Sequence, residues 1–353
     1  MPFRLLVALL LALRLGSGAL AARPGDWTHP DLGGEVTAGA ATARTLWLLG
    51  EEGRLVAFDR RTGARRRHQG AALDLLRDGP RLWILRQEAA GGRARIDDPR
   101  GGPGRSTPPL PGRALRLFAT PAGVGVLTTD AVAIPRGPGW RILTLPRDAQ
   151  GRSPLHGRVA AVLAVDGALL VGFDHGEWGG GLRRVDLGSG AVSQVENIDG
   201  DLCGGLLNPE CDPVRGLIPD AARPHCAIAA IGLLHGLGSG RVVRVCGSTV
   251  TPVYEPRVEP GDVPPDRLAG RTWPLSGLIA LDDGGWAAAA HDERLFIATG
   301  PVVLVKPIPP LRDWSGLRLN DDDPRFILVM RDCCWGLVDK PTRFDVLLVP
   351  VGP

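Results

Sequence analysis

Residues 45–63 read TLWLLGEEGRLVAFDRRTG, and this stretch decides the fold class. It contains two short apolar runs, Thr45 to Leu49 and Leu55 to Phe58, with a turn at Glu51-Glu52-Gly53 between them. A second turn follows at Thr62-Gly63. Apolar runs this short, bounded by glycine turns, are typical of β-strands joined in hairpins, and they leave no room for a helix.

The same layout of strand, turn and strand returns along the chain, at 81–85, 123–127, 168–190, 241–245, 285–297 and 325–329. The spacing is about 35 to 50 residues, as in β-propeller blades, and no long window carries a helical period. We therefore expect an all-β fold, a single β-propeller of about seven four-stranded blades, with six or eight as alternatives. The expected units are 36–70, 71–108, 112–148, 155–200, 225–258, 273–310 and 313–350.

The N-terminal residues have the features of an export signal. Leu5 to Leu13 is an apolar run, and Ala19-Leu20-Ala21 fits the small-x-small cleavage pattern. A membrane anchor is the alternative, but the run is shorter than the ~20 apolar residues that span a bilayer, and Arg14 interrupts it. We expect a signal peptide at 1–21 and a periplasmic or secreted propeller domain at 22–353, with no transmembrane segment in the mature chain.

The six cysteines agree with an oxidising compartment, because an even number in an exported chain suggests disulfides. Six cysteines allow 15 pairings, and proximity in the sequence favours Cys203–Cys211 and Cys226–Cys246. The adjacent Cys333 and Cys334 could form a vicinal bridge, shape a turn or remain reduced. The first pair would close a Cys-, Gly- and Pro-rich segment at about 199–224, which we expect to be an insertion on a face or rim of the propeller.

The composition suits a packed β protein and gives no sign of a nucleic-acid partner. The chain has 49 glycines, 32 prolines and 44% hydrophobic residues, so it can bury a core and make many turns. Its formal net charge is only +3, and no basic stripe with interleaved aromatic residues occurs. The sequence lacks the Gly-x-Ser-x-Gly, phosphate-loop and His-Glu-x-x-His motifs, so no catalytic residue is assigned.

The most unusual segment is the glycine-rich loop that follows Phe173. Asp174, His175, Glu177 and Trp178 bring two carboxylates, an imidazole and an indole into this loop. On a rigid scaffold it is a candidate ligand-binding site, with His175 and Glu177 as donors and Trp178 as a stacking surface. The alternative is a hairpin whose charges are solvated and whose Trp covers a blade edge. One histidine and one glutamate are too few for a defined zinc site.

A second polar stretch lies at the start of the expected insertion. Asp199 and Asp201 are candidate ligands for Ca²⁺, which binds hard oxygen donors. Glu210 and Asp212 could join them from the other side of a Cys203–Cys211 bridge. The spacing does not match an EF-hand, and a polar turn capped by aspartate is the alternative. The sequence predicts no cofactor, with Ca²⁺ at this stretch as the alternative.

Leu55 to Asp59, followed by Thr62-Gly63, resembles the blade repeat of quinoprotein-like (PQQ-type) propellers, in which a strand ends in an aromatic residue and Asp before a Thr-Gly turn. Leu182 to Gly190 is similar to this repeat more loosely. In both windows the aspartate would cap the turn, and the glycine would supply a positive φ. The resemblance implies the propeller fold.

The resemblance to quinoprotein enzymes at the level of their chemistry is limited to one pair of cysteines. Cys333-Cys334 is similar to the adjacent cysteines beside the cofactor of quinoprotein alcohol dehydrogenases. Those enzymes are much longer, however, and they carry calcium-binding carboxylates and a catalytic Asp that we cannot place in this sequence. The resemblance therefore implies a fold and assigns no activity.

These observations favour an exported propeller that serves as a binding or scaffolding module for a protein or carbohydrate ligand. The alternative is a propeller-type hydrolase or lyase that acts on extracytoplasmic sugars or peptides. Two or three carboxylates or histidines clustered at the central channel would favour the enzyme. A channel without such a cluster, with an exposed aromatic or hydrophobic patch on one face, would favour the binding module.

Overall fold

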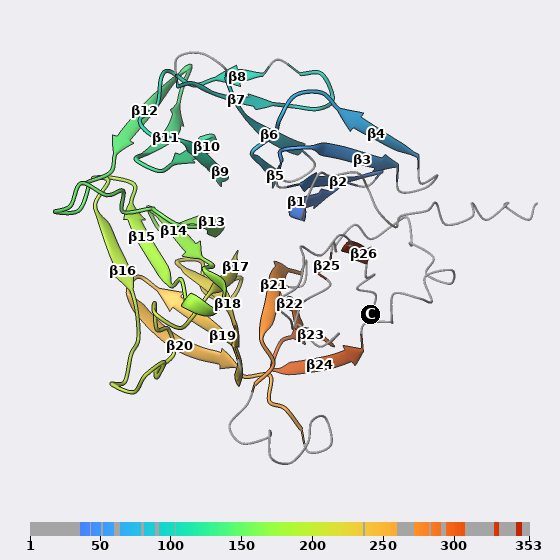
Figure 1. Cartoon of the computed structure of the whole chain (residues 1–353), viewed down its shortest axis with the longest axis vertical. Coiled ribbons are helices and arrows are strands. Elements are labelled where there is room, and N and C mark those ends of the chain that lie inside the picture. The colour runs from blue at the N-terminus through green and yellow to red at the C-terminus, as the bar shows by residue number, and fades with distance from the viewer. Residues whose placement is uncertain are drawn as a thin grey trace, which may run out of the picture.

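The fold is seen in a computed structural model of the chain. It describes residues 36–307, 328–331 and 344–347. Within 36–307 it leaves out 43, 51, 60–63, 79–80, 89–91, 103, 236, 260–271, 282–283 and 291–293. The expected signal peptide and the pair Cys333 and Cys334 lie outside these residues. Within them, six four-stranded sheets and one two-stranded sheet are arranged in a ring (Figure 1). The fold is a single all-β propeller with six four-stranded blades, a number that the sequence leaves open.

Each blade is a meander in which every strand pairs antiparallel with the next strand along the chain, the first strand lying innermost and the fourth outermost (Figure 1). The innermost strands are β1 (Val36–Ala41), β5 (Asp74–Asp78), β9 (Ala114–Thr120), β13 (Val159–Val165), β17 (Val214–Pro219) and β21 (Leu275–Ala280). The second and third strands are β2 (Thr45–Gly50) and β3 (Leu55–Asp59), β6 (Arg81–Gln87) and β7 (Ala94–Asp97), β10 (Gly123–Thr128) and β11 (Ala131–Arg136), β14 (Ala168–Phe173) and β15 (Leu182–Asp186), β18 (Cys226–His235) and β19 (Leu237–Cys246), and β22 (Trp286–Ala290) and β23 (Arg294–Thr299). The outermost strands are β4 (Arg65–His68), β8 (Arg105–Ser106), β12 (Gly139–Thr144), β16 (Val192–Val195), β20 (Thr249–Tyr254) and β24 (Val302–Pro307).

Five of the seven expected units match the blades closely, and the fifth and last units differ. The first four units and the unit at 273–310 each contain one blade. Within the last unit, 313–350, the structure describes β25 (Leu328–Arg331) and β26 (Phe344–Leu347), a two-stranded sheet that lies between the sixth and first blades (Figure 1).

The fifth blade begins earlier than the sequence indicates. Its innermost strand, β17, lies inside the segment 199–224 that we expected to be an insertion. Gly216 and the prolines at 213 and 219 give this stretch the composition of a loop. Its side chains nevertheless alternate between buried and partly exposed positions, as in a strand that lines the central channel. The connection between β16 and β17 is therefore 196–213.

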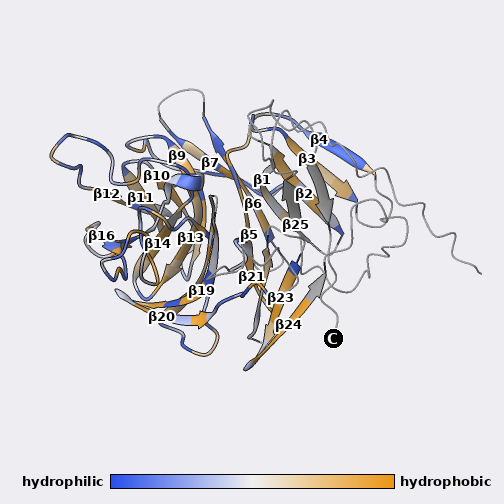
Figure 2. Ribbon diagram, turned by 60° about the horizontal axis from the view of Figure 1, so that its bottom comes forward, coloured by the Kyte–Doolittle hydropathy of each residue, from blue (hydrophilic) through white to orange (hydrophobic). Residues whose placement is uncertain are grey.

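The apolar runs are continuous because the inner strands of the blades are buried on both faces. β2, β3, β10 and β14 are buried along nearly their whole length. Apolar clusters fill the spaces between consecutive blades, and the cluster between the third and fourth blades contains Phe118, Leu127, Leu169 and Phe173. The outermost strand β4, in contrast, is a run of exposed arginines that is blue in Figure 2. Burial on both faces removes the apolar–polar alternation of a half-exposed strand.

Alternating strand directions give the propeller two unlike faces. Each innermost strand begins at the face where the second strand of its blade ends. We call this the upper face. It carries the connections into the innermost strands and the loops between the second and third strands. Loop 174–181, between β14 and β15, and connection 196–213 both belong to the upper face.

The turn at the end of Leu182 to Gly190 is capped by aspartate and contains a glycine with a positive φ, as the blade repeat predicts. The carboxylate of Asp186 accepts hydrogen bonds from the amides of Gly188 (3.0 Å) and Ser189 (2.7 Å). It also accepts one from the Ser189 hydroxyl, which is the main reason that the pKa of Asp186 lies below its ordinary value. Gly190 has a φ of +80°, in the left-handed region that glycine favours.

Both disulfides that proximity predicts are present. Cys203–Cys211 lies in connection 196–213 on the upper face, and Cys226–Cys246 joins facing residues of β18 and β19 near the lower face. Disulfides persist in oxidising compartments, so the two bonds are consistent with an exported protein. No helix in the described part of the chain is long and apolar enough to cross a membrane.

Candidate functional site

Loop 174–181 is fixed in place by its neighbour on the upper face. The amide of Gly180 donates to the carbonyl of Pro209 (2.9 Å), and the amide of Gly181 donates to the carbonyl of Asp212 (2.8 Å). A Cβ on Gly179 would overlap the carbonyl group of Glu210. The loop is therefore a shaped surface that docks on connection 196–213. We call the two segments together the platform.

Replacing Gly180 with Ala is expected to disturb the platform strongly. Its φ is +152°, and a Cβ there would overlap the carbonyl of Phe173, which cannot move without breaking the sheet. Strained backbone and overpacking together should lower the free energy of unfolding by about 2–4 kcal/mol, measured by urea denaturation. Gly176→Ala is the matched control. Gly176 has a φ of +67° with open space around it, so Gly176→Ala should lower the free energy of unfolding by only about 1 kcal/mol. Equal losses in the two variants would contradict the docked arrangement.

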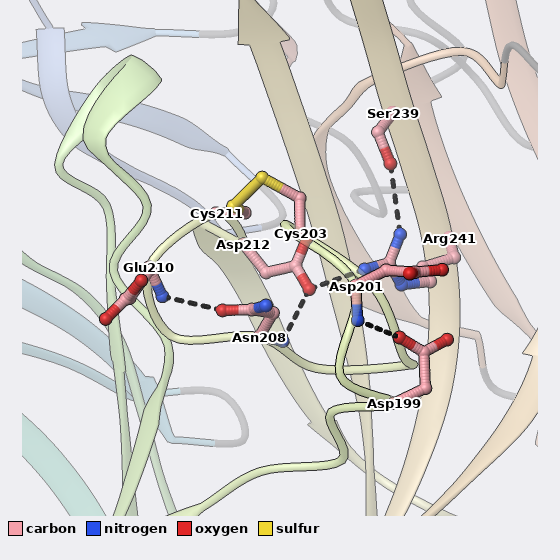
Figure 3. The surroundings of a disulfide bond; sticks show 9 residues. All are labelled: Asp199, Asp201, Cys203, Asn208, Glu210, Cys211, Asp212, Ser239 and Arg241. Atoms are coloured by element: carbon pink, nitrogen blue, oxygen red, sulfur yellow. Dashed lines mark hydrogen bonds and ion pairs between the residues drawn. A yellow bond between two sulfur atoms is a disulfide. The ribbon is translucent and has the colours of Figure 1, made fainter.

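Connection 196–213 is itself held by one disulfide and one buried ion pair (Figure 3). The Asp212 carboxylate accepts from the Asn208 amide (2.7 Å) and pairs with the guanidinium of Arg241 on β19. Arg241 also donates to the Leu206 carbonyl (2.9 Å) and to the Ser239 hydroxyl (3.0 Å). Burial raises the pKa of Asp212, and Arg241 opposes that rise. The pair therefore ties the connection to the fifth blade.

The four candidate residues of loop 174–181 have different surroundings. Asp174 is buried, accepts from the Gly176 amide (2.9 Å) and lies 3.4 Å from the guanidinium of Arg215 on β17. It therefore shapes the loop and joins it to the fifth blade. Glu177 and Trp178 lie in a short 3-10 turn, η1 (Gly176–Trp178), and both are exposed.

His175 faces inward. Its Nε2 is buried and has no hydrogen-bond partner among the described residues, and a Cβ on Gly157 would overlap it. Burial is the main reason that its pKa lies below the ordinary value, and the charges of His156 and Arg183 act in the same direction. His175 therefore fills the gap beneath the connection into the fourth blade, where burial favours its neutral form.

The exposed large apolar side chains of the upper face lie on the two segments of the platform. Trp178 is 74% exposed, Leu202 is 90% exposed and Ile198 is 55% exposed. The other large apolar side chains that are exposed in the described residues, Val302, Leu304 and Val305, belong to the outermost strand β24. A tryptophan exposed on a rigid support is typical of a contact surface.

Asp199 and Asp201 occupy an exposed turn of the platform. The Asp199 carboxylate accepts from the Asp201 amide at 3.2 Å, as in a turn capped by aspartate (Figure 3). The described residues contain no group of three or more His, Cys, Asp or Glu side chains that could hold a metal ion. Binding of Ca²⁺ by this pair stays a prediction.

The structure adds a site that sequence reasoning missed, a cavity of about 410 Å³ on the upper face. Its walls come from the upper ends of β1, β9 and β13, from the end of β2 and the loop that follows it, and from residues 71–73 directly before β5. Arg113 and Arg158 line it at equivalent positions, each directly before an innermost strand. The signal in the sequence is a repeated Gly-Arg pair before an apolar residue, Gly112-Arg113-Ala114 and Gly157-Arg158-Val159.

A buried ion pair supports the floor of this cavity. Arg116 on β9 lies 3.0 Å from Asp74 on β5 and donates two hydrogen bonds to the carbonyl of Val159 on β13. The second oxygen of Asp74 accepts from the Leu117 amide (2.7 Å). Burial raises the pKa of Asp74, while Arg116 and the Leu117 amide lower it. One arginine thus joins the second, third and fourth blades.

Comparisons with known proteins agree on the fold alone. No protein-family model matches the chain, and no curated protein matches its sequence. In three dimensions it is similar to YCF48 bound to D1 peptide, with a TM-score of 0.51, 10% sequence identity and coverage of 90% of this chain and 94% of that chain. It is also similar to the β-propeller domain of Cps50 (Swd1) from Myceliophteria thermophila, with a TM-score of 0.47, 14% identity and coverage of 92% of this chain and 99% of that chain.

Proposed function

We propose that this protein is an exported binding module that holds a protein partner on its upper face. The observation that carries the proposal is the platform, where Trp178 and Leu202 are exposed on segments fixed by Cys203–Cys211 and by buried ion pairs. Keeping large apolar side chains in water is unfavourable unless a partner covers them. A rigid support lowers the entropic cost of binding.

The charged groups of the upper face support binding over catalysis. The carboxylates of Asp74, Asp174 and Asp212 are each paired with an arginine and hold blades or loops together. Catalytic carboxylates act as proton donors, bases or nucleophiles and need access to a substrate. An exposed tryptophan and leucine, together with three aspartates that are held in ion pairs, favour a partner-binding module. The peptide-bound state of YCF48 is a precedent for peptide binding by a propeller of similar fold.

Export is part of the proposal. The two disulfides support it, because such bonds are rare in reducing compartments. The apolar run and small residues of 1–21 support it independently.

The test is affinity capture by the immobilised mature chain from an extracytoplasmic fraction of its source. The double variant Trp178→Ala/Leu202→Ser should recover the partner at least about ten-fold less well, since a few central apolar residues dominate most interfaces. Val302→Ser/Leu304→Ser is the matched control, because it removes exposed apolar side chains from β24 instead. It should recover the partner as the unaltered protein does. Equal recovery by both variants, each with an unchanged unfolding temperature, would contradict the proposal.

A further inference from the structure

The cavity between the first four blades carries positive charge that no described residue neutralises. Four charged residues line it, Glu52, Arg113, Arg116 and Arg158. Glu52 lies 3.0 Å from Arg54, and Arg116 lies 3.0 Å from Asp74. Arg113 and Arg158 are exposed and form no ion pair in the described part of the chain. Two guanidinium groups are therefore available at the rim.

The local backbone holds the two arginines at the rim. Each follows a glycine with a positive φ, +75° at Gly112 and +112° at Gly157, and each precedes the first residue of an innermost strand. β9 and β13 are neighbours in the ring (Figure 1), so the two side chains approach one cavity from adjacent blades. Guanidinium groups present a planar fork of donors that matches a carboxylate.

We propose that this cavity binds the carboxylate side chains of an acidic peptide segment. The inference rests on the proposed function and gives the chemistry of the partner. The cavity volume of about 410 Å³ falls within the range of about 300–1,000 Å³ that is usual for ligand pockets. It holds a few side chains, and two arginines match one or two carboxylates.

The walls favour a peptide over an anionic polysaccharide. The residues that line the cavity are mostly Gly, Ala, Leu and Val, and none of them is aromatic. They provide no ring on which a sugar could stack. A long polyanion needs an extended basic surface, and the described surface that best fits this need is Arg65-Arg66-Arg67 on β4, at the outer edge of the first blade. A compact cavity with two cations is better matched to a short acidic segment.

The experiment is an anisotropy titration of the mature protein with a fluorescent ten-residue peptide in which Glu alternates with Gly. Arg113→Glu/Arg158→Glu should weaken binding at least about ten-fold, because two attractions become repulsions. The matched control is Arg136→Glu/Arg223→Glu, which changes the net charge equally at two exposed residues of the lower face and should weaken binding less than about two-fold. A peptide with Gln in place of Glu should not bind.

Three outcomes of this titration would overturn the inference. They are no binding of the Glu peptide up to millimolar concentration, equal loss in both double variants, or a loss that Arg65→Glu/Arg66→Glu reproduces. Preferred binding of a sulfated polysaccharide over the Glu peptide would also overturn it. Partner capture that still depends on Trp178 and Leu202 would leave the proposed function standing in each case, so the two failures are distinguishable.

Discussion

Replacing Arg116 with Leu is expected to destabilise the propeller by about 3–5 kcal/mol at pH 7, measured by urea denaturation. The reason is that the substitution leaves the carboxylate of Asp74 without its ion-pair partner. Asp74 is buried, and Arg116 provides its charge compensation as well as two hydrogen bonds to the carbonyl of Val159. Without the guanidinium, a carboxylate is left buried beside a carbonyl that has lost its donors.

The loss in Arg116→Leu should depend on pH in a defined direction. Burial already holds the pKa of Asp74 above its ordinary value in the folded protein. A group of this kind contributes stability that is fully present below its pKa in the unfolded chain and is lost as the pH rises through its folded pKa. Removing Arg116 raises the folded pKa further. The difference between the variant and the unaltered protein should therefore be largest at neutral pH and shrink on acidification toward pH 4.

The double variant Asp74→Asn/Arg116→Leu is the control for charge. It removes the buried carboxylate, keeps an oxygen that can accept from the Leu117 amide, and should recover part of the stability at pH 7. It should also lose the pH dependence. If Arg116→Leu lowers the free energy of unfolding equally at pH 4 and pH 7, then lost packing, rather than the buried charge, causes the destabilisation.

Replacing Arg241 with Ala is expected to cost about 3–5 kcal/mol and to loosen the platform. Among the described residues, Arg241 forms the ion pair with Asp212, whose side chain is almost fully buried. Arg241 also donates a hydrogen bond to the carbonyl of Leu206. Since the Asp212 carbonyl accepts from the Gly181 amide, the disturbance should reach loop 174–181. Hydrogen exchange should therefore accelerate at 179–181 and 203–212, and remain unchanged in β9 and β10 of the third blade.

Asp212→Asn/Arg241→Ala distinguishes a charge effect from a loss of contacts. If the uncompensated carboxylate causes the loss, the double variant should be more stable than Arg241→Ala alone. If both are equally unstable, with fast exchange in both segments, the contacts of Arg241 with Leu206 and Ser239 would be the cause.

The fold could be predicted because its determinants are local. The runs Thr45 to Leu49 and Leu55 to Phe58 are continuous because both faces of these strands are buried, and the turns between them need glycine. Both disulfides lie between residues close in the chain, at separations of 8 and 20. The start of the fifth blade was missed because Val214–Pro219 has the composition of a loop, and only its position beside the channel shows why it is a strand.

The site was less predictable because its features arise between distant segments. Loop 174–181 stands out in the sequence, but the sequence does not show that Asp174 is paired with Arg215 or that the glycines dock on Pro209 and Asp212. The cavity depends on Arg113 and Arg158, which lie in different blades and have no unusual neighbours in the sequence apart from the preceding glycine. The packing of the third blade against the fourth brings them to one cavity.

The central claim is that the upper face is the binding face, and the most direct measurement is hydrogen exchange of the protein with and without its captured partner. We predict protection on the upper face, at 113–116, 157–159, 176–178 and 199–204, with no change in the lower-face turns at 121–122, 137–138 and 220–225. Protection confined to those lower-face turns, or to the outermost strands β4 and β24, would contradict the account.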